Sequence, residues 1–142
     1  MQPALFDSSI YITALRRGDN AALGLRRFAM DAPLWLSSVV LEELYAGAAE
    51  RDRQVVERLE RDFDRARRIL VPNLSDWTQT GRVLARLAAK YHHEQIGQGR
   101  LTNDALIAMS AARSGFRVIT ANERDFKRLA EFRTFQWQVT TL

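Results

Sequence analysis

The chain has 142 residues, no cysteine and a formal net charge of +4, with 21 lysine and arginine residues against 17 aspartate and glutamate residues. This length fits one domain with a sizeable hydrophobic core, and the absence of cysteine excludes thiolate catalysis, Cys-based zinc sites and disulfide scaffolds. The start has no basic segment ahead of its apolar run and no stretch is long enough to span a bilayer, so a soluble, cytoplasmic protein is expected. Only Lys90 and Lys127 are lysines. The arginine excess allows a nucleic-acid partner, but a compositional preference for arginine explains it equally well.

The first predicted strand and helix place an acid at a strand end. The apolar run Ala4-Leu5-Phe6 predicts a short buried strand, and the apolar positions from Ile10 to Leu15 predict a helix that ends near Gly18. Asp7 then follows the carboxyl end of the strand. It can serve as the cap of the helix, with two serines behind it, or as part of a functional site.

The next strand and helix carry two adjacent acids. Leu34-Trp35-Leu36 predicts a strand, and Ser37-Ser38 is expected to cap a helix over 39–49. The helical spacing of the apolar residues turns Glu42 toward solvent and puts Glu43 at the edge of the packed face. Glu43 is therefore the candidate for a functional role, although a solvated position fits its spacing equally well.

Three further helices are predicted before residue 96. Apolar residues at helical spacing, within a run dense in both charges, predict a solvated helix over 50–69 with internal ion pairs. An arginine-lined face for RNA or a protein partner is the alternative for this helix. Helices are also predicted over 20–30 and over about 76–95, the latter capped by Ser75 or Asp76.

The end of this last helix and the loop after it contain no metal or dinucleotide motif. His92 and His93 are adjacent, so they diverge on a helix and cannot face one metal ion together. Gly97-Gln98-Gly99 follows a helix rather than a strand and opens no helix immediately, which excludes a dinucleotide-binding fingerprint. Arg100 beside this loop is a candidate phosphate contact.

The stretch over 101–112 is predicted to form a buried helix. After Asp104 no charged residue appears until Arg113, and a helix that is apolar on nearly every side is buried on nearly every side. An ionised carboxylate in such surroundings needs compensation. Either Thr102 or Asn103 caps the helix, so that Asp104 lies in its favourable first turn, or the acid belongs to a site.

The last elements complete an α/β pattern. A strand is predicted over 117–120, then a turn and a short helix to about Ala130, and an edge strand over 135–139. Strands that alternate with helices along one chain predict a three-layer α/β/α architecture, with a mainly parallel central sheet and helices on both faces. We expect one domain over 1–142.

Five oxygen-bearing side chains are expected to meet at one edge of this sheet, because ligands bind at the carboxyl ends of parallel strands. Asp7 follows the first strand, Asn122 and Asp125 follow a later one, and Glu43 and Asp104 lie in early turns of core helices. Crowded carboxylates repel one another unless some are protonated or a cation lies among them. Oxygen ligands without cysteine or paired histidine point to Mg²⁺ or Mn²⁺ rather than zinc.

Four short motifs occur in order along nearly the whole chain. They are Asp7-Ser8-Ser9, Glu43-Leu44-Tyr45-Ala46-Gly47, Asn103-Asp104-Ala105-Leu106-Ile107-Ala108 and Thr120-Ala121-Asn122-Glu123-Arg124-Asp125-Phe126. This ordered set resembles the PIN-domain family, specifically the VapC-like toxins of type II toxin–antitoxin systems. The resemblance implies a PIN-like ribonuclease domain over 1–142, namely a magnesium-dependent endoribonuclease, with Mn²⁺ as a substitute ion. It also implies an RNA substrate, a homodimer, and a cognate antitoxin whose C-terminal segment lies across the active-site groove.

The resemblance also assigns the catalytic positions. The family's three invariant acids fall on Asp7, Glu43 and Asp104, of which Asp7 and Asp104 would hold the metal ion. The fourth position is commonly aspartate in the family and falls on Asn122 here. Asn122 keeps an oxygen ligand but brings no charge, so Asp125 is the alternative fourth carboxylate.

Ser9 distinguishes this interpretation from a phosphoryl-transfer enzyme. The haloacid-dehalogenase pattern needs an aspartate two residues after the strand-end acid, and Ser9 occupies that position. In the PIN-like interpretation, the same serine matches a small polar position that supports Asp7. The remaining alternative is a catalytically degraded PIN-like domain that binds RNA or a protein without cutting, and Asn122 is its best support.

Overall fold

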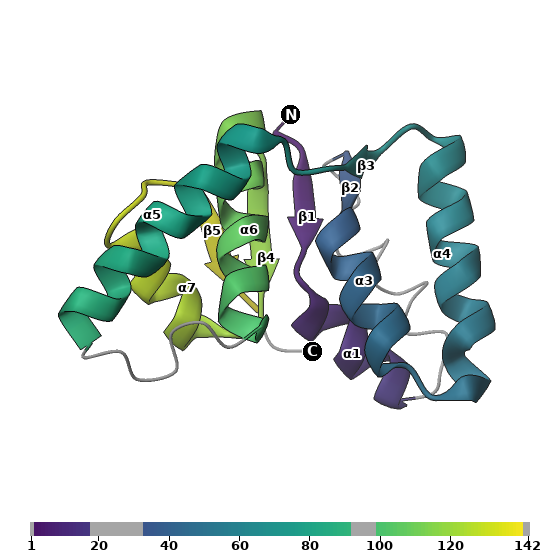
Figure 1. Ribbon diagram of the computed structural model, residues 1–142. Coiled ribbons are helices and arrows are strands. Elements are labelled where there is room, and N and C mark those ends of the chain that lie inside the picture. Colours follow the sequence, from purple (N-terminus) through teal and green to yellow (C-terminus); the bar gives the residue numbers. More distant parts are fainter. Residues whose placement is uncertain (1, 18–32, 92–98, 141–142) are drawn as a thin grey trace.

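A five-stranded parallel sheet forms the centre of the computed structural model, which describes residues 2–17, 33–91 and 99–140. The strands follow the order β3-β2-β1-β4-β5, and every neighbouring pair is parallel. Helices flank the sheet, which confirms the expected three-layer α/β/α architecture (Figure 1). The strands are β1 (Ala4–Phe6), β2 (Leu34–Ser37), β3 (Ile69–Leu70), β4 (Arg117–Thr120) and β5 (Trp137–Val139). The helices are α1 (Ser8–Arg17), α3 (Ser38–Gly47), the 3₁₀ helix η1 (Glu50–Asp52), α4 (Arg53–Arg65), α5 (Leu74–Tyr91), α6 (Gly99–Ser114) and α7 (Glu123–Ala130).

The strand β1 lies at the centre of the sheet, between β2 and β4. Its three residues are fully buried, as expected for a strand of a parallel sheet that is covered on both faces. The pairing register sets Phe6 opposite Ile119 of β4, and the backbone N–H of Asp7 donates to the carbonyl of Ile119 at 3.0 Å. The strand pair therefore ends with Asp7 close to Thr120, with which it shares a hydrogen bond. This is the carboxyl end of β1, where α1 begins (Figure 1).

Helix α6 is the buried helix that the apolar stretch predicts, but it starts earlier than expected. Every residue over 104–111 is buried. The helix begins at Gly99 and has no acid in its first turn. Asp104 therefore lies beyond the first turn, and the capping role considered for Thr102 or Asn103 is wrong.

The strand β3 was not predicted from the sequence. The charged helix expected over 50–69 consists of η1 and α4, and it ends at Arg65. Arg67 then adopts a left-handed conformation with a φ of 56°, and β3 follows. Ile69 and Leu70 continue the helical spacing of apolar residues, but they pair with β2. A strand of two residues is too short to show the alternation that identifies a strand in a sequence.

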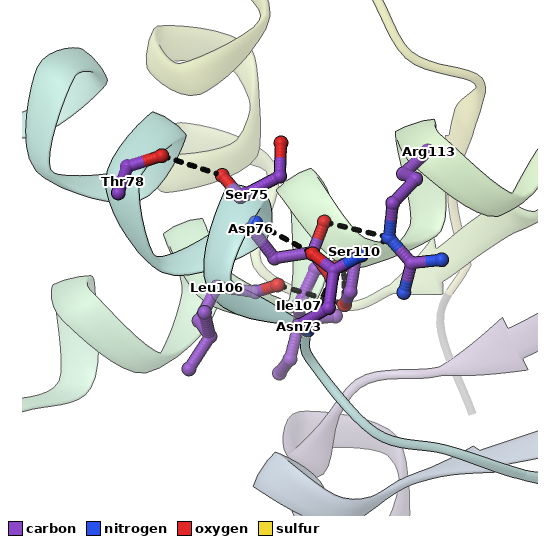
Figure 2. Close-up of polar contacts among 8 residues, drawn as sticks. All are labelled: Asn73, Ser75, Asp76, Thr78, Leu106, Ile107, Ser110 and Arg113. Carbon is purple, nitrogen blue, oxygen red and sulfur yellow. Dashed lines mark hydrogen bonds and ion pairs between the residues drawn. The ribbon is translucent and has the colours of Figure 1, made fainter.

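Helix α5 begins with a reciprocal cap that connects it to α6 (Figure 2). The side-chain oxygen of Asn73 accepts from the backbone N–H of Asp76 at 2.9 Å, and the Asp76 carboxylate accepts from the N–H of Asn73 at the same distance. The Nε of Arg113, in the last turn of α6, donates to both carboxylate oxygens of Asp76 at 2.9 and 3.0 Å. The capping side chain is therefore that of Asn73, and Ser75 was not the cap.

The cap of α3 and the edge position of β5 agree with the sequence, although α3 ends at Gly47 rather than at residue 49 and β5 begins at Trp137 rather than at residue 135. Ser37 accepts from the N–H of Val39 at 3.2 Å and caps α3. Gly115, with a φ of 73°, follows the last residue of α6 and supplies the left-handed conformation that commonly ends a helix. The strand β5 lies at the edge of the sheet, as predicted.

The structure leaves three of the predicted features undescribed. The helix expected over 20–30, the pair His92-His93 and the residues Gly97-Gln98 lie outside the described ranges. Within those ranges, none of the helices combines the length and the apolar character needed to cross a bilayer.

Replacement of Arg113 by methionine should destabilise the fold, because it leaves the Asp76 side chain, which is 2 % exposed, without its cation. Loss of a hydrogen bond to a charged group costs about 2 kcal/mol. Urea unfolding should therefore show a lower midpoint with an unchanged slope. Arg58→Met, at an exposed position of α4, is the control and should change the free energy of unfolding by less than about 0.5 kcal/mol. Equal stability of the two variants would show that the ion pair contributes nothing.

Candidate active site

Asp7 is held at the carboxyl end of β1 by two hydroxyl groups. Its side chain is buried, with Ser9 Oγ donating to Oδ1 and Thr120 Oγ1, at the end of β4, donating to Oδ2. Burial raises the pKa of Asp7 above its ordinary value. These hydrogen bonds, together with the backbone N–H groups of Ser9 and Ile10, oppose the rise because they stabilise the charged form. Asp7 therefore contacts the start of α1 and also connects it to the end of β4.

Backbone N–H groups fix the direction of both hydroxyl groups. The N–H of Ala121 donates to Ser9 Oγ at 3.1 Å, and the N–H of Asn122 donates to Thr120 Oγ1 at 2.8 Å. Each hydroxyl oxygen accepts from the backbone, which leaves its proton for Asp7. The support expected from Ser9 is present. The role of Thr120 was not predicted, because threonine is common in strands and its position alone gives no sign of a partner.

Asp104 lies at the centre of the acidic cluster. Its side chain is 2 % exposed, on the buried helix α6. Burial, followed by the negative charges of Asp7, Glu43 and Asp125, raises the pKa of Asp104 to about 8, whereas the charge of Arg100 acts in the opposite direction. Because electrostatic influence falls with distance, these contributions show that the four acids lie near one another.

Glu43 belongs to this cluster and Glu42 does not. Glu42 is exposed, as predicted, and accepts a hydrogen bond from the side-chain amide of Asn103 at 3.1 Å. Glu43 is half-buried, and burial raises its pKa while the side chains of Ser8 and Asn103 oppose the rise. Within the described residues, the Oε1 atom of Glu43 is buried without a hydrogen-bond partner. A buried oxygen without a donor is costly, so a further donor or a cation would be stabilising here.

Asn122, the residue at the fourth predicted position, is hydrogen-bonded to two of the acids. It caps α7, where its side-chain oxygen accepts from the backbone N–H of Asp125 at 3.5 Å. Its amide nitrogen Nδ2 donates to Oδ2 of Asp125 at 2.9 Å and to Oδ2 of Asp104 at 3.3 Å. Both candidates for the fourth position therefore lie in the same cluster.

The structure brings all five predicted side chains to one edge of the sheet, but not around a single point. Among residues 2–17, 33–91 and 99–140, no three Asp, Glu or His side chains are close enough together to hold one ion. Asp7 and Asp104 are hydrogen-bonded to the uncharged side chains of Ser9, Thr120 and Asn122 instead. The arrangement is therefore a cluster of acids whose repulsion is reduced by neutral donors.

Several solved structures share this architecture. The chain matches one in DNA-bound VapBC from Salmonella typhimurium, with a TM-score of 0.68, 20% identity and 98% of each chain covered. It matches one in VapBC2 from Rickettsia felis, bound to a DNA fragment from the promoter, with a TM-score of 0.68 and 21% identity, over 99% of this chain and 100% of the other. For VapBC-1 from nontypeable Haemophilus influenzae the TM-score is 0.64 and the identity 24%, over 97% and 98% of the two chains. At these identities the similarity shows a shared fold.

None of the curated proteins matches this chain. The sequence model of the PIN-domain family does match it, over residues 4–132. That range includes all five side chains of the cluster and the first four strands along the chain, β1 to β4. Because the family's sequence pattern extends over most of the chain, and because the fold agrees with it, the chain belongs to the PIN-domain family.

Proposed function

We propose that this PIN-domain chain is a VapC-like toxin of a type II toxin–antitoxin system, and that it acts as a Mg²⁺-dependent endoribonuclease with Mn²⁺ as a substitute ion. PIN domains are generally nucleases, so hydrolysis of a phosphodiester bond is the expected reaction. One observation carries the proposal: the acids Asp7, Glu43 and Asp125 lie near Asp104 at one edge of the sheet, where the Asn122 amide is hydrogen-bonded to both Asp104 and Asp125.

The donor chemistry of these residues fits magnesium. Every candidate ligand is a carboxylate or amide oxygen, the ligand type that this ion prefers. A cation would relieve both the repulsion at Asp104 and the unpartnered Oε1 of Glu43. We propose that Asp7 and Asp104 hold the ion, and that Glu43 completes the site directly or through water. Since no three acids among the described residues converge on one point, binding requires some of them to turn away from their present partners.

The chain's own residues supply orientation and charge. A bound divalent ion would lower the pKa of a coordinated water and offset charge on the departing oxygen of the phosphodiester. Ser9 and Thr120 hold the Asp7 carboxylate in one orientation through their hydroxyl groups. Asp104 has to lose its proton before it can act as a ligand, because a protonated carboxyl binds cations poorly.

RNA and a cognate antitoxin are the proposed partners. The net charge of +4 favours an anionic substrate, and the choice of RNA rests on the VapC-like resemblance. The matched structures are VapBC complexes, which supports an antitoxin for this chain. A cavity of about 320 Å³ beside Glu43, lined by Ile12, Leu15, Arg16 and Leu44, provides room for antitoxin side chains. The homodimer implied by the resemblance is proposed on that basis alone.

A catalytically inactive PIN-like domain that binds RNA or a protein is the second candidate. Asn122 favours it, because this residue replaces a charge that the family commonly has with a neutral amide. Incubation of the purified protein with total RNA, with Mg²⁺, Mn²⁺ or a chelator, separates the two candidates when the cut ends are mapped. Metal-dependent cleavage supports the nuclease, whereas binding without any cleavage supports the second candidate.

Asp104→Asn and Asp7→Asn should each lower the rate of RNA cleavage by more than about 100-fold, because each removes a proposed ligand of the ion. A fluorogenic RNA assay with Mg²⁺ measures the rate, and circular dichroism checks that the variants fold. The matched control is Asp64→Asn, at an exposed position of α4, which should cleave like the wild type. Cleavage by Asp7→Asn at the wild-type rate would contradict the assignment.

The metal-free protein should become less stable as the pH rises from about 4 to about 8. Asp104 has a pKa of about 8 in the folded protein against an ordinary value of 3.8. The folded state therefore binds more protons than the unfolded state in this window, and the free energy of unfolding falls with rising pH. Urea unfolding in chelator at several pH values measures the slope. Asp104→Asn should flatten it and the control Asp64→Asn should not, so an unchanged slope in Asp104→Asn would contradict the prediction.

A further inference from the structure

The same four-residue pattern, asparagine followed three positions later by aspartate, begins two helices of this chain. It occurs as Asn73-Leu74-Ser75-Asp76 at α5 and as Asn122-Glu123-Arg124-Asp125 at α7. At α5 the cap is closed, because the Asn73 side chain accepts from the backbone of Asp76 while the Asp76 carboxylate accepts from the backbone of Asn73, each at 2.9 Å (Figure 2). Arg113 also forms an ion pair with the Asp76 carboxylate and so balances its charge. This aspartate has a structural role.

The cap at α7 is open. The backbone N–H of Asn122 does not donate to Asp125 but to Thr120 Oγ1, at 2.8 Å. The Asp125 carboxylate accepts instead from Nδ2 of the Asn122 side chain, at 2.9 Å. Asp125 is thereby held at the acidic cluster by a side chain, and its charge acts on Asp104. In the part of the chain that the structure describes, no salt bridge neutralises Asp125 in the way that Arg113 neutralises Asp76.

The Asn122 amide stands between two carboxylates. Its Nδ2 donates to Asp125 at 2.9 Å and to Asp104 at 3.3 Å, and a primary amide has one proton for each of these bonds. The orientation of the amide is determined by its oxygen, since only the oxygen can accept from the backbone N–H of Asp125. An aspartate at position 122 could cap the helix equally well, but it would put a third carboxyl group where a donor now joins two acids.

We propose that Asn122 is a positioning residue that joins Asp104 to Asp125 without a cation and thereby limits this site to one divalent ion. The inference rests on the proposed function, in which Asp7 and Asp104 hold that ion. A second ion between Asp104 and Asp125 would have to displace a donor that already bonds one oxygen of each carboxylate. Asn122 is also uncharged, so the site has one negative charge fewer than it would have with an aspartate at position 122. The number of charged ligands strongly affects the affinity of a site for such an ion.

Isothermal titration of the metal-free protein with Mn²⁺ alone, without RNA, tests the inference. The wild type should bind one ion per chain, and Asn122→Asp should bind two. In chelator, Asn122→Asp should unfold at a lower temperature than the wild type, because its added charge meets two carboxylates, and Mn²⁺ should raise its unfolding temperature by more. Asn73→Asp makes the same substitution in the closed cap beside Arg113, and this matched control should bind one ion.

A swapped variant separates the position of the amide from a loss of folding. Asn122→Asp combined with Asp125→Asn restores the wild-type charge and one donor between the two positions, so it should return to one ion. Two ions bound by the wild type, two bound by the swapped variant, or one bound by a folded Asn122→Asp would each overturn the inference while leaving the proposed nuclease intact. A wild type that binds no Mn²⁺ and cuts no RNA would overturn the proposed function as well.

Discussion

The hydrogen bonds around the Asp7 carboxylate are the contacts on which the rest of the site depends. A buried carboxylate is tolerated only where donors satisfy it, and Ser9 and Thr120 are the side-chain donors here. Thr120 reaches Asp7 because β1 and β4 pair with Phe6 opposite Ile119. A shift of this register by one residue would turn every side chain of the strand to the opposite face and remove Thr120 from Asp7. The order of the central strands is therefore a condition for the site as well as for the core.

The second constraint is the helix that carries Asp104. The residues over 104–111 are buried without interruption, so an apolar residue at position 104 would suit the packing better than an acid. Departures from the local rules of folding tend to occur at functional sites. The energetic cost of the acid at position 104 is reduced by the groups around it. Burial and three other acids keep a proton on Asp104 near neutral pH, while the Asn122 amide supplies a neutral donor. Among the residues that the structure describes, the cluster is thus accommodated without a salt bridge to a cationic side chain.

The sequence predicts the architecture well, because most elements are long enough to show their spacing. The buried strand before Asp7, the apolar helix around Asp104 and the difference between Glu42 and Glu43 all follow from periodicity. Two kinds of feature could not be predicted. The strand β3 has only two residues, Ile69 and Leu70, which continue the spacing of the preceding helix. Contacts between distant residues, such as Thr120 with Asp7 and Arg113 with Asp76, depend on strand order and helix packing, and neither leaves a local pattern.

The shortness of the two outer strands limits how other polypeptides can attach to this molecule. The strand β3 at one border has two residues and β5 at the other has three. Such short edge strands offer few unpaired backbone N–H and C=O groups to another extended segment. Many proteins with β-sheets avoid edge-to-edge aggregation in this way. Recognition of another polypeptide should therefore rely on side chains presented by the surrounding helices, and specificity can then evolve there without disturbing the central pairing.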